Sequence, residues 1–467
     1  MEKKENAYLT VYLTLSLAVI LTLCLLLIEG VRRNGAALEA SCAADVGMQS
    51  IMAEYHRELQ KQYNLFAIDS SYGTVSCGKR NTEARLYHYL ERNLCAGKKD
   101  FFLLDTNGVE LTGVSILSDK NGAVFRKRAS EAIRDDVGLE LLEQLREWME
   151  TVEINGLEEA NPEQEKTLLD REIEEYEYTD ERKEEEKVEN PTEQLNEMRR
   201  GGILALVLTD EQTLSERALD TEKLIGNRMK QGKANCGNLE DVSAEDSFLE
   251  RFFFQEYLLR YMGYFGSEKE EGGLRYQLEY LIAGKNTDAD NLRSFVWRLC
   301  NLREVSNAAY LFSDAEKSGE AEMMAAGICT ALLVPELTPV LHATILLGWA
   351  YAESVCDVKR LMSGGKVPLL KDAGSWQLGL TEALSGIFEG ESEEKGLSYE
   401  DYLRVFMMLT NEDILTVRAM DMVEADIRRT PGNEYFRLDA CYDSVQAKIN
   451  ISGKHGYAFE AIREKTY

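Results

Sequence analysis

Residues 7–28 read AYLTVYLTLSLAVILTLCLLLI, and this stretch decides how the rest of the chain is placed. Its 22 residues include no charged residue, proline or glycine. A helix rises about 1.5 Å per residue, so about 20 apolar residues cross the roughly 30 Å hydrocarbon core of a bilayer. The sequence therefore predicts a membrane anchor at the N-terminus, with residues 1–28 forming a short tail and a transmembrane helix.

Two other interpretations fit this stretch less well. The apolar core of a cleaved signal peptide is about 7–15 residues long and precedes a small-residue cleavage site. Here the run is longer, and Glu29-Gly30-Val31-Arg32-Arg33 follows it. A buried core helix of a soluble protein usually has a polar face or is shorter. We therefore favour an uncleaved, single-pass anchor.

The charges flanking the anchor bear on its orientation. Lys3 and Lys4 precede it, while Arg32 and Arg33 follow it, so the positive-inside rule is nearly balanced. The preceding tail has only six residues, and most of the net charge of −29 lies after the anchor. We expect the tail in the cytoplasm and the large C-terminal part outside the cell.

One face of the anchor carries small and hydroxyl side chains at steps of four residues: Thr10, Thr14, Ala18 and Thr22. Such a stripe allows another membrane helix to approach closely and to form hydrogen bonds in lipid. The same threonines also commonly bond the carbonyls of their own helix, without any further role. Both interpretations stay open.

Composition excludes several classes of function. A net charge of −29 over 467 residues argues against nucleic acid and anionic lipid as partners. The nine cysteines include no CxxC pair, and the four histidines are dispersed, so no metal or cofactor site is predicted. Cys77 and Cys95 are candidates for a disulfide bond outside the cell.

The chain after the anchor predicts an α+β protein that is mostly α. Residues 29–68 are expected to form a helical stalk that extends the anchor to about residue 62, as one rod on the order of 80 Å long. Residues 69–155 predict a small α/β segment. In it, strands at 101–104 and 109–117 are joined by a hairpin turn at Asp105–Gly108, and a helix covers 124–152.

The second half is separated from the first by a run of acidic residues. Residues 158–193 contain sixteen Asp or Glu and five Lys or Arg, which predicts a solvated linker over 156–198. Residues 199–467 are expected to form a mainly helical domain with C-terminal strands. We predict a buried strand at 201–208, strands within 435–451, and helices at 248–265, 274–283, 291–311, 321–333, 341–361, 399–410 and 411–428.

No set of residues identifies a reaction. The stretch Ser363–Lys366 lacks the serine or threonine that would complete a phosphate-binding loop, because Val367 follows the lysine. Glu279 and Glu353 lie in apolar helices, where they are either paired catalytic acids or structural groups in ion pairs. We favour ion pairs, and we predict that the protein is not an enzyme.

Several stretches together resemble a known family. They are YLTVYLTLSL (8–17), AEYHRELQKQYNLFAID (53–69), LRYQLEYLIAGKNTDADNL (274–292), LREVSNAAYLFSD (302–314), GWAYAES (348–354), GGKVPLLK (364–371) and LSYEDYLRVF (397–406). In this order they resemble the domain-of-unknown-function family numbered 5702, which comprises single-pass proteins of clostridia-like bacteria.

The resemblance implies no assigned activity. The N-terminal helix and stalk of this family are similar to minor pilin-like components of tight-adherence pilus systems. Pilin anchors carry a glutamate five residues after the cleavage point, whereas a cut after Asn6 would place Val11 there. We expect fold-forming roles for the matching residues, among them a buried ion pair of Arg303 with Glu279 or Glu353. The matching residues are Tyr276, Glu279, Tyr280, Gly284, Lys285, Asn291, Arg303, Asn307, Trp349, Glu353, Gly365, Lys366 and Pro368.

These observations favour a structural or assembly component of a tight-adherence-type pilus or secretion system, with the membrane as its predicted partner. The alternative is a tethered extracellular module that binds a ligand and has no pilus role. A surface enzyme is the least favoured class, because no catalytic spacing is present.

Overall fold

The structure of the chain is a computed structural model that describes residues 2–94, 102–156, 202–208, 214–239, 247–385, 395–453 and 456–467. It is mostly helical with a few strands, which confirms the predicted class. The chain forms two compact units that alternate along the sequence. The first unit comprises Met1–Phe125, Met229–Ala244 and Thr430–Tyr467, and the second comprises Arg126–Arg228 and Glu245–Arg429.

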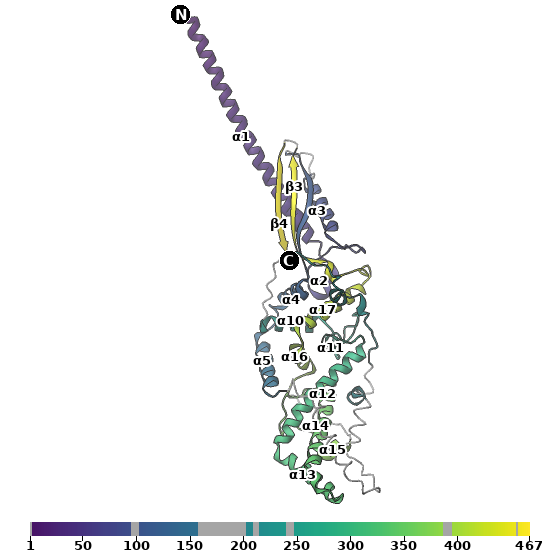
Figure 1. The fold of residues 1–467 in the computed structure, drawn as a ribbon. Helices are drawn as coiled ribbons and strands as arrows, with labels where there is room; N and C mark the ends of the chain where they lie inside the picture. The colour runs from purple at the N-terminus through teal and green to yellow at the C-terminus, as the bar shows by residue number, and fades with distance from the viewer. Residues whose placement is uncertain are drawn as a thin grey trace. The chain divides into compact units, whose positions relative to one another are not determined.

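The first unit begins with one long helix, α1 (Glu2–Met52), which extends well beyond the sheet beside it (Figure 1). Its apolar N-terminal half is exposed from Tyr8 to Ile28, whereas residues from Ala36 onward are buried on one face. Within the described part of the chain, α1 is the one helix long and apolar enough to cross a membrane, a test that N-terminal signal sequences also pass.

The predicted rod to residue 62 is too long, because α1 ends at Met52. A separate helix, α2 (Arg57–Tyr63), follows, and Nδ1 of His56 caps it by accepting a hydrogen bond from the backbone N–H of Leu59 at 3.2 Å. Between the helices, Tyr55 forms a β-bridge with Ile68. This long-range pairing draws the chain out of the helix although no proline or glycine interrupts it.

Four strands form the sheet of the first unit. They are β1 (Ile68–Asp69), β2 (Leu104–Ile116), β3 (Cys441–Gly453) and β4 (Ala458–Thr466). The C-terminal strand β3 pairs antiparallel with each of the other three, so the predicted C-terminal strands are present and supply the centre of the sheet.

The predicted hairpin at Asp105–Gly108 is wrong. These residues lie inside the continuous strand β2, whose partner is β3. A register shift between Thr106 and Gly108 places one extra residue there, so the turn-like sequence forms an irregularity in the strand instead of reversing it.

The core of the first unit lies between the sheet and two helices, the packed half of α1 and α3 (Lys79–Leu94). Both helices run beside the strands in Figure 1. Small residues on α1 let the helix approach its neighbours closely, and larger apolar side chains from α3, β2 and β3 fill the space between them. The core includes Ala36, Ala40, Ala44, Met48, Leu86, Leu90, Val114, Val445, Ala447 and Ile449.

The second unit is helical. Helices α4 (Asp119–Ile133) and α9 (Ile225–Lys230) each contain a boundary between the units. The remaining helices are α5 (Leu139–Ile154), α8 (Ile203–Val207), η1 (Thr221–Lys223), α10 (Phe248–Tyr261), α11 (Gln277–Ala283), α12 (Asp288–Ser313), α13 (Ala315–Ala331), η2 (Pro335–Leu337), α14 (Thr338–Met362), α15 (Leu380–Ser385), α16 (Tyr399–Leu409) and α17 (Glu412–Arg428). The short helix η3 (Leu438–Ala440) belongs to the first unit.

Two local predictions for the second unit are wrong. The helix expected over 124–152 is divided into α4 and α5, and Gly138 is the N-cap of α5. The strand expected over 201–208 is the helix α8, because this apolar run packs against α12 and α14 instead of a sheet. A short apolar run does not by itself distinguish the two structures.

The predicted domain boundaries follow the order of the sequence, whereas the two units do not. The strands at the C-terminus, grouped above with the helical domain at 199–467, pair with segments from the predicted stalk (29–68) and from the segment at 69–155. The acidic linker lies outside the described residues, which stop at residue 156 and resume at 202.

Candidate functional site

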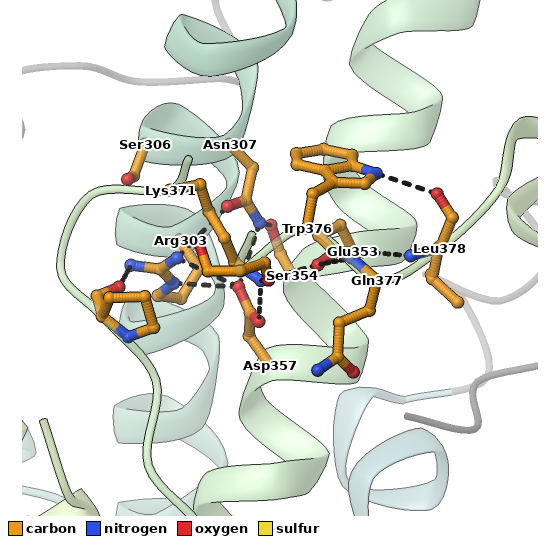
Figure 2. A network of polar contacts seen from close by, with 12 residues as sticks. Arg303, Ser306, Asn307, Glu353, Ser354, Asp357, Lys371, Trp376, Gln377 and Leu378 are labelled. Carbon is orange, nitrogen blue, oxygen red and sulfur yellow. Dashed lines mark hydrogen bonds and ion pairs between the residues drawn. The ribbon is translucent and has the colours of Figure 1, made fainter. Parts of the chain in front are cut away.

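Helices α12 and α14 and the loop after α14 bring four charged side chains together inside the second unit (Figure 2). Arg303 Nη2 lies 3.1 Å from Asp357 Oδ2. Lys371 Nζ lies 2.6 Å from Glu353 Oε1 and 2.8 Å from Asp357 Oδ1. Each of these side chains is at most 1% exposed. We call these four residues the buried ionic cluster.

Helical spacing positions the members of this cluster. Glu353 and Asp357 are four residues apart on α14 and therefore lie on one face, as do Arg303 and Asn307 on α12. The Asn307 amide joins the two helices, because its Nδ2 donates to Asp357 Oδ2 at 3.2 Å and to Ser354 Oγ at 3.0 Å.

The same side chains hold the loop between α14 and α15. Arg303 Nη1 donates to the carbonyls of Pro368 and Leu369 at 2.8 and 2.7 Å. The Glu353 carboxylate accepts hydrogen bonds from the backbone N–H groups of Gln377 at 3.1 Å and Leu378 at 2.9 Å. Buried side chains thus satisfy backbone groups that have no helix or sheet partner.

The arrangement of charges in the cluster suits a structural role. Its two cations and two carboxylates balance in charge, and all four are enclosed. Burial raises the pKa of Glu353, although the adjacent Lys371 favours its ionised form. Since substrate has no access to a fully buried side chain, the arrangement suits fixing the loop to two helices. Removing one member would leave an uncompensated buried charge.

The structure differs from the predicted pairing of these residues. Arg303 lies in a buried ion pair, but its partner is Asp357 instead of Glu279 or Glu353. Glu353 pairs with Lys371. The reason is geometric. Asp357 lies one turn after Glu353 on α14 and faces Arg303, and the loop places Lys371 beside both acids.

Glu279 lies elsewhere, on α11, and has no cationic partner among the residues that the structure describes. Its Oε1 accepts hydrogen bonds from the backbone N–H of Phe265 at 2.9 Å and from the Tyr399 hydroxyl at 2.7 Å. Burial raises the pKa of Glu279 to about 7. The predicted ion pair of Glu279 is therefore absent from the described residues. Its carboxyl group is hydrogen-bonded to neutral groups and titrates near neutral pH.

Sequence reasoning missed Asp357 and Lys371. Both left a signal. Asp357 follows Glu353 by four residues in an otherwise apolar helix, and Lys371 ends the stretch GGKVPLLK directly after two leucines. Two acids on one helical face predict a cationic partner, and Lys371 is a cation in an apolar setting shortly after that helix.

A separate cavity of about 640 Å³ lies on another face of α12. Near the start of the helix, its wall includes an ion pair of Arg293 with Asp290 at 2.9 Å. Trp297 is 44% exposed in it and offers an indole surface, whereas Tyr351 is buried. Its lining residues are Gly202, Ile203, Lys285, Asp290, Arg293, Ser294, Trp297, Cys300, Asn301, Glu304 and Tyr351.

Comparison with known proteins gives one match. Residues 181–453, more than half of the chain, match the Family of unknown function (DUF5702). The chain belongs to this family. The matched range contains the buried ionic cluster and the cavity, whereas the apolar half of α1 precedes it. No curated protein and no solved structure matches the chain.

Three of the residues that match the family motifs have structural roles in turns and at helix ends. Gly284 ends α11 in the left-handed region, with φ 69°. Asn291 fixes the next turn, because its side chain accepts from the backbone N–H of Lys285 at 2.7 Å and donates to its carbonyl at 2.9 Å. A Cβ atom on Gly365 would lie 2.5 Å from Cγ of Arg360.

Two further predictions concern the anchor and metal sites. The hydroxyls of Thr14 and Thr22 donate to the carbonyls of Val11 and Ala18 at 2.9 and 2.7 Å, which is the bonding expected within a single helix. A packing role for the stripe that also includes Thr10 stays a prediction. Over the described ranges, no group of three or more His, Cys, Asp or Glu residues is arranged to hold a metal ion.

Proposed function

We propose that this protein is a membrane-anchored structural or assembly component of a tight-adherence-type pilus or secretion system, with its large C-terminal part outside the cell and no catalytic activity of its own. The observation that carries the proposal is the division of α1. Its first half exposes apolar side chains from Tyr8 to Ile28, and its second half is part of a folded core.

This division has a physical consequence. Exposed leucine, isoleucine and valine side chains along a whole helix are unfavourable in water, at about 25 cal/mol per Å² of apolar surface. A lipid bilayer or neighbouring apolar helices remove that cost. Because the same helix continues into the core of the first unit, a force or displacement at the anchor acts directly on the folded unit.

The test is photocrosslinking in cells from positions 10, 14, 18 and 22 of the full-length chain. We expect crosslinks from the stripe of Thr10, Thr14, Ala18 and Thr22 to other pilus or secretion proteins, and fewer from positions on the opposite face, such as Leu23. Crosslinks to lipid alone, together with unchanged piliation after gene deletion, would overturn the proposal.

Orientation has its own test. Protease added to intact cells is expected to digest the chain beyond Glu29 and to leave the anchor protected. Protection of the entire chain would contradict the outward placement. Release of the full-length protein into the soluble fraction by alkaline carbonate would contradict the anchor itself.

The cavity beside α12 favours a second candidate function, a tethered module that binds a ligand. Its volume of about 640 Å³ is in the range of small-molecule sites. Specific ligand binding by the full-length protein, detected as quenching of tryptophan fluorescence that Trp297→Ala removes, would support this function. A stable Trp297→Ala variant with an unchanged ligand response would argue against it.

A further inference from the structure

We propose that Cys77 and Cys236 form a disulfide bond that fastens residues 234–239 to the loop before α3 in the first unit. The proposal rests on the proposed function in one respect, because an outward-facing compartment supplies the oxidising conditions. Both residues belong to the first unit, and both thiols are free in the structure, with Cys236 exposed and Cys77 half-buried.

Two contacts bring the segments together. Nδ2 of Asn235 donates a hydrogen bond to Sγ of Cys77 at 3.5 Å, across 158 positions of sequence. Nζ of Lys79 lies 3.3 Å from Oδ1 of Asn238. Cys236 lies between these two contacts, directly after Asn235. The two thiols therefore belong to segments that are already held side by side.

The segment is firmly positioned on the strand. Gly237 N donates to Asp119 Oδ1 at 2.8 Å, and Asn238 N donates to the Val114 carbonyl at 2.9 Å. Oδ1 of Asn238 accepts from Val114 N at 3.0 Å. A Cβ atom on Gly237 would lie 2.4 Å from the Val114 carbonyl oxygen, so the segment sits too close to β2 for any side chain there.

The disulfide bond would help to keep the edge of the sheet covered. An uncovered edge strand offers its backbone groups to other chains, and proteins commonly cover such edges. The segment at 234–239 covers β2 around Val114. A covalent link at Cys236 would keep the cover in place when its hydrogen bonds open transiently.

The reaction is a thiol–disulfide exchange. One S–S bond forms between Cys77 and Cys236, and two S–H bonds break. Two electrons and two protons pass to a disulfide oxidant such as oxidised glutathione, whose S–S bond breaks to give two thiols. Sγ of Cys236 contacts its own segment at the carbonyl of Ala234, at 3.9 Å, so its side chain rotates toward Cys77 before the bond forms.

The test uses the purified full-length protein in detergent, treated with oxidised glutathione, alkylated and digested for mass spectrometry. We expect a cross-linked peptide pair containing Cys77 and Cys236 that is lighter by two hydrogen atoms than the reduced pair. It should be absent from Cys77→Ser and Cys236→Ser and retained in Cys42→Ser, which alters another exposed thiol.

A second readout is thermal stability. The oxidised protein should melt several degrees above the reduced protein, because the bond restricts the unfolded chain. This difference should vanish in Cys77→Ser. A Cys77–Cys95 bond, glutathione attached to both thiols without a link, or no oxidation would each overturn the proposal.

An experiment in living cells tests the disulfide bond and the outward placement separately. Alkylation after rapid acid quenching should find Cys77 and Cys236 protected in living cells. A bond that forms in the purified protein but not in cells would contradict the outward placement. Failure in the purified protein would refute the disulfide and leave the placement unaffected.

Discussion

Two carboxylates of the second unit, Glu353 and Glu279, are both fully buried, yet they are accommodated in opposite ways. Glu353 has the ammonium group of Lys371 at 2.6 Å. Glu279 receives hydrogen bonds only from neutral groups, and its Oε2 has no hydrogen-bond partner in the described part of the chain. A cation beside a buried acid favours its ionised form and opposes the effect of burial, whereas an acid with only neutral hydrogen-bond donors has its pKa raised to about 7.

The largest loss of stability is expected when the cation beside Glu353 is removed. Lys371→Met leaves Glu353 and Asp357 buried without their shared cation, which should lower the free energy of unfolding by about 3–5 kcal/mol. Urea titration followed by tryptophan fluorescence measures this, since all four tryptophans lie in the second unit.

Lys366→Met is the matched control, because Lys366 is exposed in the same loop. Its effect should remain within about 0.5 kcal/mol. If both variants lost the same small amount, the buried ionic cluster would not hold the loop.

The pH dependence of stability in Glu279→Gln tests the arrangement in which a buried acid has no cationic partner. The folded pKa of Glu279 is about 7, above its ordinary value of 4.5. Stability from this group is therefore fully present below pH 4.5 and is lost as pH rises to about 7. The variant lacks this loss, so its stability relative to the native protein should improve by about 3 kcal/mol between pH 4.5 and pH 8.

Denaturation curves of both proteins at several pH values give this difference. A parallel pH dependence for Glu279→Gln and the native protein would mean that Glu279 is ionised throughout.

A double substitution sharpens the contrast between the two acids. In Lys371→Met combined with Glu353→Gln, the charge left behind is partly removed, so the loss should be smaller than for Lys371→Met alone. The coupling energy from the double-mutant cycle should be about 1–3 kcal/mol. A coupling near zero would contradict direct pairing at 2.6 Å.

The smallest effect concerns the hydrogen bond to Glu279. Tyr399→Phe removes the hydroxyl that lies 2.7 Å from Oε1 and should cost about 1 kcal/mol. That hydroxyl lowers the pKa of Glu279, so its loss should move the pH transition upward. A transition that stays in place would show that the Tyr399 hydroxyl does not contribute to the pKa of Glu279.

The sequence predicted most helices of the second unit, and in the first unit it predicted the N-terminal helix and the C-terminal strands but not how the strands pair. Helices α10 to α14, α16 and α17 follow from apolar periodicity, which is a local property. The pairing of β2 with β3 joins segments more than three hundred residues apart, and nothing within either strand specifies the partner. The turn-like sequence at Asp105–Gly108 was therefore read as a hairpin.

The candidate site shows the same division. The burial of Arg303 was predictable from its apolar helix, whereas its partner depends on where the loop places Lys371. The environment of Glu279 depends on Tyr399, which is 120 residues away. Partner choice between distant side chains is set by packing that no local pattern records.

The central position of β3 has a consequence for biosynthesis. Ser70 beside β1 bonds the carbonyl of Ala440, 370 residues later, so the first unit lacks its middle strand until translation is almost complete. At about 5–20 residues per second, this delay is on the order of 20–75 s. Throughout that interval the nascent chain would hold β1 and β2 without a partner, and a premature stop near the end of the message would leave the unit beside the anchor unfinished.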